Sequence, residues 1–243
     1  MKDLLDVHTH TIASGHAYGT IRDNANAAKA AGLELLGIAD HAPHMPGTCH
    51  NFNFLNFKII PRDGYGIKLI MGAELNIIDY SGSTDLPGQI LKKLDYAVAS
   101  LHDPCIDPGS VEENTAAFIG VMRNPHVVIL GHPDNPNFPV DFDRVAAAAK
   151  ENRVLLEVNN HSYVSKGHRA GSRECAKVML AACKKYGTAV IMSSDAHTEF
   201  DVGNHKNSIE VIKENNFPEE LVINSDPAHF LEIVKYRKSL APK

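Results

Sequence analysis

Histidine stands out in the composition of this chain. There are 14 histidines among 243 residues, against 9 phenylalanines, 7 tyrosines and no tryptophan. Some lie close to a second histidine or to an acidic residue, as in His8-Thr9-His10 and Asp195-Ala196-His197. Residues two apart in an extended segment point to the same side, so each pair can present two donors to one ion. Imidazoles and carboxylates together suit zinc, manganese or iron, and the sequence therefore predicts a metal site.

The elements that must position these donors alternate between strand and helix. Apolar runs predict strands over Leu4–His8, Leu35–Ala39, Ile67–Ala73, Tyr96–Ser100, Val127–Leu130, Val154–Val158 and Ala189–Met192. Helices are predicted over Asp23–Ala31, Leu86–Leu94, Ser110–Met122, Phe142–Glu151, Ser172–Tyr186, His205–Asn215 and from Asp226-Pro227 to Lys238. Near-continuous apolar strands that alternate with helices are typical of parallel sheets. We therefore expect an α/β fold in which residues 1–243 form a single domain.

Metal-binding or polar residue types follow every predicted strand. They are His8 and His10, His41, Glu74, His102, His132, the segment Asn159-Asn160-His161, and Asp195 with His197. Taken singly, His102 or His132 is more often a hydrogen-bonded histidine of the core or of a loop. However, chance does not place such residues after one strand after another. In a parallel barrel the ends of these strands open on one face, so the residues that follow them would lie together. About seven strand–helix repeats around one core favour a barrel, with an open doubly wound sheet as the alternative.

The long loop His44–Asp63 carries three phenylalanines among polar residues. Loops of this length are often functional, so a lid over the substrate is one interpretation. Packing of the loop on the protein surface is the other, and the sequence does not decide between them.

Charge and composition narrow the classes of partner. Hydrophobic residues make up 44% and charged residues 22% of the chain, as in ordinary globular proteins. The net charge of -5, without a basic patch, argues against nucleic acid and membrane surfaces as partners. No apolar run reaches the length of a membrane span, and the first residues lack the apolar stretch of a signal peptide. We expect a cytoplasmic protein, and leave open whether it forms a homo-oligomer.

Four segments together resemble the signatures of the PHP (polymerase and histidinol phosphatase) superfamily of metallohydrolases. They read Asp6-Val7-His8-Thr9-His10, Gly37-Ile38-Ala39-Asp40-His41, Val128-Ile129-Leu130-Gly131-His132-Pro133 and Ser194-Asp195-Ala196-His197. The resemblance covers nearly the whole chain, and it is strongest to the YcdX-type bacterial phosphatases. It implies a distorted (β/α)7 TIM-like barrel.

The resemblance also implies three divalent metal ions, with zinc expected first and manganese or iron as alternatives. His8, His10, Glu74 and Asp195 would hold the first ion. Glu74 would bridge to a second ion, which His102 and His132 also bind. His16, His41 and His197 would hold the third ion. Three divalent ions against two carboxylates leave a local charge of about +4, because metal-bound histidines are neutral.

A site with this charge suits an anionic group. We expect a phosphatase that hydrolyses phosphate monoesters of small metabolites, with a metal-bound hydroxide as the nucleophile. Histidinol phosphatase activity is a close alternative. Phosphodiesterase or exonuclease activity is a further one, disfavoured by the acidic charge and by the absence of polymerase domains. A regulatory module that binds metal without catalysis is the alternative outside enzymes.

Other residues near the strand ends are candidates by position. His161 and Asp134 could serve as the acid that protonates the leaving group, although a simple loop hydrogen bond is at least as good an interpretation. Lys166, His168 and Arg169 could bind the phosphate of the substrate, against the alternative of a solvated charged loop. Asp40 could orient a metal-binding imidazole from behind, and Ser194 is assigned a similar supporting position.

Overall fold

The computed structural model describes residues 2–164 and 167–241. Within them, parallel strands form two sheets, ordered β1-β2-β3 and β4-β5-β6-β7-β8. The strands are β1 (Leu5–Thr9), β2 (Leu35–Ile38), β3 (Lys68–Met71), β4 (Glu74–Asn76), β5 (Ala97–Ser100), β6 (Val127–Leu130), β7 (Leu155–Asn159) and β8 (Val190–Ser193). The expected α/β fold with parallel strands is confirmed.

The two sheets meet at two narrow joints. At one joint a single parallel bridge pairs Thr9 with Ala196, and His10 N donates to Ala196 O at 2.9 Å. At the other, a single bridge pairs His41 with Glu74, whose carbonyl accepts from Ala42 N at 2.9 Å. The strands are therefore arranged as two sheets that are joined at both ends by single parallel bridges.

The strand predicted over Ile67–Ala73 differs from the observed structure. It ends at Met71, and after two intervening residues the chain continues as β4 in the other sheet. A Cβ on Gly72 would lie 2.6 Å from the ring of Tyr96 and 2.8 Å from its carbonyl oxygen, so only glycine fits this crossing. Tyr96 is buried and donates from its hydroxyl to Val7 O at 2.6 Å, which ties β5 to β1.

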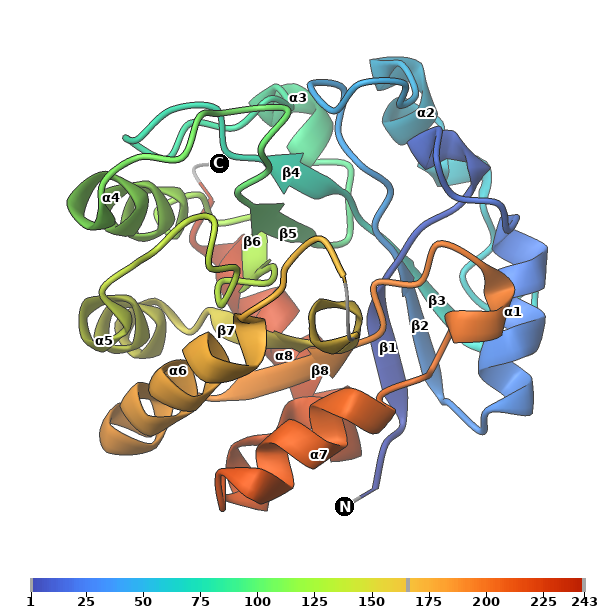
Figure 1. Cartoon of the computed structure of the whole chain (residues 1–243). Helices are drawn as coiled ribbons and strands as arrows, with labels where there is room; N and C mark the ends of the chain where they lie inside the picture. Colours follow the sequence, from blue (N-terminus) through green and yellow to red (C-terminus); the bar gives the residue numbers. More distant parts are fainter. Residues whose placement is uncertain (1, 165–166, 242–243) are drawn as a thin grey trace.

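Helices surround the strands, as Figure 1 shows for α4 to α7, and α8 lies behind them in that view. The helices are α1 (Ile21–Ala30), α2 (Asn51–Leu55), α3 (Gly88–Leu91), α4 (Val111–Val121), α5 (Phe142–Asn152), α6 (Ser172–Tyr186), α7 (Lys206–Glu214) and α8 (Pro227–Ser239). Short 3-10 helices are η1 (Ile12–Ser14), η2 (Phe57–Ile59), η3 (Asn160–Tyr163), η4 (Glu199–Asp201), η5 (Glu219–Leu221) and η6 (Ile223–Ser225). Helix α3 is shorter than predicted: it begins after Pro87, its N-cap residue, and ends at Leu91. None of the helices in the described ranges has both the length and the apolar character needed to cross a bilayer.

Buried polar side chains fasten the ends of this framework. Arg237 of α8 is 2% exposed and donates to the carbonyl oxygens of Met122, Asn124, Val127 and Asn152, at 2.6 to 3.1 Å. It thereby joins α8 to the segment that leads into β6, to the first residue of β6 and to the end of α5. Each of these carbonyls would lose a charged donor if the arginine were removed.

The loop His44–Asp63 is partly folded into the core. Phe54 and Phe57 are buried, whereas Phe52 is 73% exposed. Asp85 Oδ2 accepts from the backbone N–H of His44 at 2.9 Å and so fixes the start of the loop. Packing against the hydrophobic core therefore accounts for two of the three phenylalanines, Phe54 and Phe57.

Candidate metal centre

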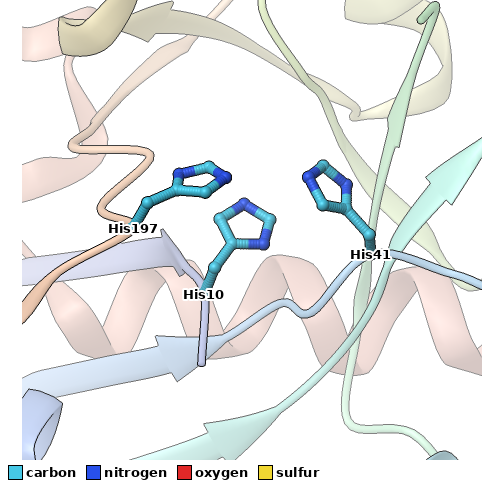
Figure 2. A group of neighbouring side chains, drawn as sticks. All are labelled: His10, His41 and His197. Atoms are coloured by element: carbon cyan, nitrogen blue, oxygen red, sulfur yellow. The ribbon is translucent and has the colours of Figure 1, made fainter. Parts of the chain in front are cut away.

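The predicted donors lie together where the strands end. His8 and His10 come from the end of β1, His41 follows β2, and Glu74 opens β4. The remaining donors follow β5, β6 and β8: they are His102, His132, Asp195 and His197. Figure 2 shows His10, His41 and His197 reaching one space from three separate segments of the chain.

Glu74 is the centre of the cluster and is 1% exposed. Its Oε1 lies 3.3 Å from His8 Nε2, 3.2 Å from His102 Nε2 and 3.1 Å from His132 Nε2. Its Oε2 lies 2.6 Å from His41 Nδ1. The two carboxylate oxygens thus face different imidazoles, as a residue that bridges two ions requires.

Asp195 faces the cluster beside His10 and His8. Its Oδ1 lies 3.2 Å from His10 Nε2 and 3.8 Å from His8 Nε2. Its backbone has φ of +56°, and His132 also has a positive φ, of +31°. Residues other than glycine adopt such angles at a cost, and they gather at functional sites.

Several buried donor atoms of the cluster make no hydrogen bond of normal geometry to any described residue, although imidazole nitrogens and carboxylate oxygens lie close together. They are His8 Nε2, His10 Nε2, His41 Nδ1, Glu74 Oε2 and His102 Nε2. Donor atoms lie within 4.8 Å of one another in three sets, namely His10-His41-His197, His8-His10-Glu74 and His41-Glu74-His102. Buried polar atoms without partners are costly, and a cation at the cluster would satisfy them. The residues present therefore fit divalent ions held by nitrogen and oxygen donors.

His16 belongs to the outer edge of the cluster. Its ring stacks beside those of His41 and His197, with centroid distances of 4.9 Å to each. His16 is exposed and stands at the opening, unlike the buried histidines below it.

Buried hydrogen bonds orient the inner imidazoles. His8 Nδ1 lies 2.7 Å from Glu157 Oε1, and His10 Nδ1 lies 3.1 Å from Ser14 Oγ. Ser14 in turn donates to Asp40 Oδ1 at 2.7 Å. In each case the outer nitrogen faces a hydrogen-bond acceptor, so a metal ion at the cluster would meet the Nε2 side of the ring. Asp40 thus supports His10 through Ser14, as a residue behind the metal site.

The other predicted supporting residue, Ser194, acts at a joint between the sheets. Its hydroxyl donates to Asp6, and Asp6 also accepts from the backbone N–H of Gly203 at 2.9 Å. His205 Nε2 lies 3.6 Å from Asp6 Oδ1, and its Nδ1 lies 2.7 Å from Asp3 Oδ2. This buried network holds the segment just before Asp195 against β1.

Burial and charge set opposite protonation states on neighbouring histidines. Burial lowers the pKa of His10 well below its ordinary value, and the nearby His41 and His197 add to this. Burial also lowers the pKa of His132, to about 4, with Arg169 contributing. Burial alone would do the same at His8, but the carboxylates of Glu157, Glu74 and Asp195 raise its pKa well above the ordinary value. Neutral imidazole is the form that binds metal, and His10 and His132 are in that form at neutral pH.

A cavity of about 400 Å³ opens above the cluster. It is lined by His16, His41, Met45, Leu101, His102, Asp103, Pro104, Asn135, His161, His168, Arg169, Asp195 and His197. Arg169 Nη1 lies 3.0 Å from Asp195 Oδ2 and donates to Ser162 Oγ at 3.2 Å. His168 is exposed at the rim, where its Nε2 lies 3.1 Å from Asp103 Oδ2.

The other candidate residues from the sequence differ in their position relative to the cavity. His161 lines the cavity, whereas Asp134 does not. Asp134 is completely buried and accepts from Tyr163 Oη at 2.5 Å, and burial raises its pKa to about 7. Lys166 lies outside the described residues.

Sequence reasoning gave no role to Glu157, Ser14 or Asn76. Glu157 is an acidic residue in strand β7, two positions before Asn159. Residues two apart in a strand point to the same face, and this spacing could have indicated that Glu157 lies near the cluster. Asn159 Nδ2 donates to Glu157 Oε2 at 2.9 Å and to Asp195 Oδ2 at 3.2 Å. Glu157 and Asn159 therefore hold His8 and Asp195 in place from β7.

Comparison with known proteins gives matches over most of the chain. Residues 6–216 match the family model described as PHP domain. A protein named "Probable phosphatase" from Clostridium novyi is 45% identical over 240 residues, covering 99% of this chain and 98% of the relative. A "Probable phosphatase" from Clostridium botulinum strain Okra is 48% identical over 240 residues, again covering 99% and 98%.

A solved structure shares the fold at low identity. Histidinol phosphate phosphatase from Lactococcus lactis, solved with zinc, L-histidinol and phosphate, superposes with a TM-score of 0.59. It is 17% identical, and the match covers 89% of this chain and 95% of that one.

Proposed function

The chain belongs to the PHP domain family, and on this premise we propose that it is a metal-dependent phosphatase of small phosphate monoesters. The observation that carries the proposal is the set of unpartnered, buried donor atoms around Glu74, placed directly beneath a cavity. The names of the full-length relatives point to the same reaction class.

We assign the donors to three divalent ions. His8, His10, Glu74 and Asp195 would hold one ion, and Glu74, His102 and His132 a second. His16, His41 and His197 would hold a third at the opening. When bound, such ions activate water and neutralise phosphate charge. Zinc is our first choice, since the Lactococcus lactis phosphatase was solved with zinc, and manganese or iron would suit the same donors.

The side chains of the cavity wall then divide the remaining tasks. Arg169 is anchored by Asp195 and Ser162, and its guanidinium can pair with phosphate oxygens through two N–H groups. His161 is the best-placed group to protonate the leaving oxygen, because it lines the cavity and Asp134 does not. His168 stands at the rim of the cavity, and we assign it to binding the phosphate of the substrate.

The cavity volume supports a small substrate. About 400 Å³ accommodates a phosphorylated metabolite such as histidinol phosphate, so that substrate stays a candidate. A phosphodiester or nucleic-acid substrate has no specific observation in its favour, and neither has a purely regulatory metal module.

We further propose that residues 1–243 form one domain, because the two ends of the chain pair with each other. Leu4 N donates to Asn224 O at 2.9 Å, and Asn224 Nδ2 donates to Leu5 O at 3.1 Å. A cytoplasmic location and the oligomeric state stay predictions from the sequence.

Elemental analysis followed by a phosphate-release assay tests the function. We expect up to three divalent ions per chain and faster hydrolysis of p-nitrophenyl phosphate than of bis(p-nitrophenyl) phosphate. Glu74→Gln should lose both metal and activity, whereas His229→Gln, at an exposed position on α8, should keep both. A fully metallated protein that hydrolyses neither ester would refute the proposal.

A further inference from the structure

A chain of polar side chains runs from a surface turn to the metal centre. Asp85 Oδ2 accepts from Asn76 Nδ2 at 2.7 Å, and Asn76 Oδ1 lies 2.8 Å from His102 Nδ1. His102 Nε2 then lies 3.2 Å from Glu74 Oε1. Asn76 is completely buried, and His102 is 8% exposed.

The amide of Asn76 can take only one orientation in these surroundings. Its NH2 group donates both to Asp85 Oδ2 and to Ala42 O, the latter at 3.1 Å. Its carbonyl oxygen is therefore the atom that faces His102, and an oxygen can only accept a hydrogen bond. His102 must carry its proton on Nδ1, which leaves the Nε2 lone pair directed at Glu74.

Asp85 reaches Asn76 because the intervening segment folds back on itself. Ile77 pairs with Thr84 through an antiparallel bridge, and Ile78 N donates to Ser83 O at 3.0 Å. The turn closes at Gly82, with φ of +88°, where a Cβ would lie 2.2 Å from Val121 N of α4. The turn is thus packed against a helix, and the carboxylate of Asp85 has a fixed place.

We propose that Asp85 is a positioning residue that sets the tautomer of His102 through Asn76. The proposal rests on the proposed function only in taking His102 as a metal ligand. The same carboxylate also accepts from Asn76 N at 3.0 Å and from His44 N at 2.9 Å, so it ties the start of the loop carrying Met45 to the same ligand.

Three donors surround Asp85, which explains why a carboxylate is needed. An asparagine here would replace one acceptor oxygen by an NH2 group facing N–H donors. In either orientation of that amide, one donor of Asn76, its backbone N–H or its NH2 group, meets an NH2 group instead of an acceptor. Asn76 would then shift, and the ring of His102 could place its proton on either nitrogen. Residues behind a metal ligand typically change metal affinity about 10- to 100-fold when mutated.

The test compares Asp85→Asn with Asp79→Asn in the full-length protein. Asp79 lies in the same turn and accepts from Ser81 and Ser83, but it makes no contact with Asn76, so its variant controls for a weakened turn. Nitrogen-15 NMR of the histidine rings reports the tautomer of His102, identified by the signal missing from His102→Gln. Competition with a chelator gives the affinity for zinc.

In Asp85→Asn we expect loss of the ordered His102 Nδ1–H signal and about tenfold weaker binding of one zinc ion. Asn76→Ala, which removes the acceptor itself, should show the same loss, and Asp79→Asn should stay within about twofold of the parent. An Asp85→Asn protein with the parental ring signal, or with zinc affinity equal to that of Asp79→Asn, would overturn the proposal. Phosphate release does not enter either measurement, so failure of the proposed phosphatase activity is a separate outcome.

Discussion

The buried ion pairs of His205 give the protein a stability that depends on pH. Burial alone would lower the pKa of this imidazole, but Asp6 and Asp3 raise it to about 10 from the ordinary 6.5. A group whose pKa is raised by folding stabilises the folded state fully below its unfolded pKa, and loses that contribution as pH rises through the folded value. The relevant window for His205 therefore runs from pH 6.5 to about pH 10.

The size of the effect follows from the same shift. One pKa unit corresponds to about 1.4 kcal/mol, so proton linkage at His205 removes on the order of 2 kcal/mol of stability between pH 7 and pH 9. His205→Gln lacks this titration. The difference in unfolding free energy between parent and variant should therefore shrink by that amount over the same interval.

Urea unfolding at pH 7, 8 and 9 measures this difference. A chelator is present throughout, so that metal binding contributes to neither protein. His229→Gln, which removes an exposed histidine of α8, should differ from the parent by a constant amount at all three pH values. A difference for His205→Gln that is also constant, or that grows with pH, would show that the ring is not held protonated by Asp3 and Asp6.

Three further outcomes are expected. Arg169→Lys keeps the positive charge but loses the planar guanidinium that can pair with two phosphate oxygens. We expect kcat/KM for a phosphate monoester to fall about 10- to 100-fold while the melting temperature is unchanged. A variant with the parental kcat/KM would show that Arg169 does not bind the substrate. Arg237→Met should lower the free energy of unfolding in urea by about 3 kcal/mol, because buried carbonyl oxygens lose their donor. Lys235→Met, on the exposed face of α8, should lower it by under about 0.5 kcal/mol, and equal losses in the two variants would contradict the role of Arg237. Removal of metal by a chelator should lower the melting temperature of the parent and leave that of Glu74→Gln nearly unchanged, and an equal drop in both would argue against Glu74 as a ligand.

The strand ends were predictable because each carries its own local signal. An apolar run followed by His marks both the strand and the donor, and His8, His41 and His132 were placed in this way, whereas Glu74 was expected after a strand and instead opens β4. His16 follows no strand, and only the family resemblance pointed to it.

Contacts between distant segments were not predictable. His205 pairs with Asp3, which is 202 positions away, and nothing in the local sequence of either residue indicates the other. The pairing of Asn76 with Asp85 depends on a turn whose closure requires α4. Asp134 was expected near the cavity because it follows β6, but the backbone turns at His132 and brings Asn135 to the wall.

The proposed ligands come from both sheets, and this arrangement bears on how the chain could evolve. One sheet carries His8 and is followed by His10 and His41, while the other begins with Glu74 and is followed by His102, His132, Asp195 and His197. Ions bound between them would act as cross-links across a seam that the backbone closes with single bridges. A lineage that changed its ion preference would have to keep this seam closed at every step, so the route to a new chemistry is narrower than the number of ligand positions suggests.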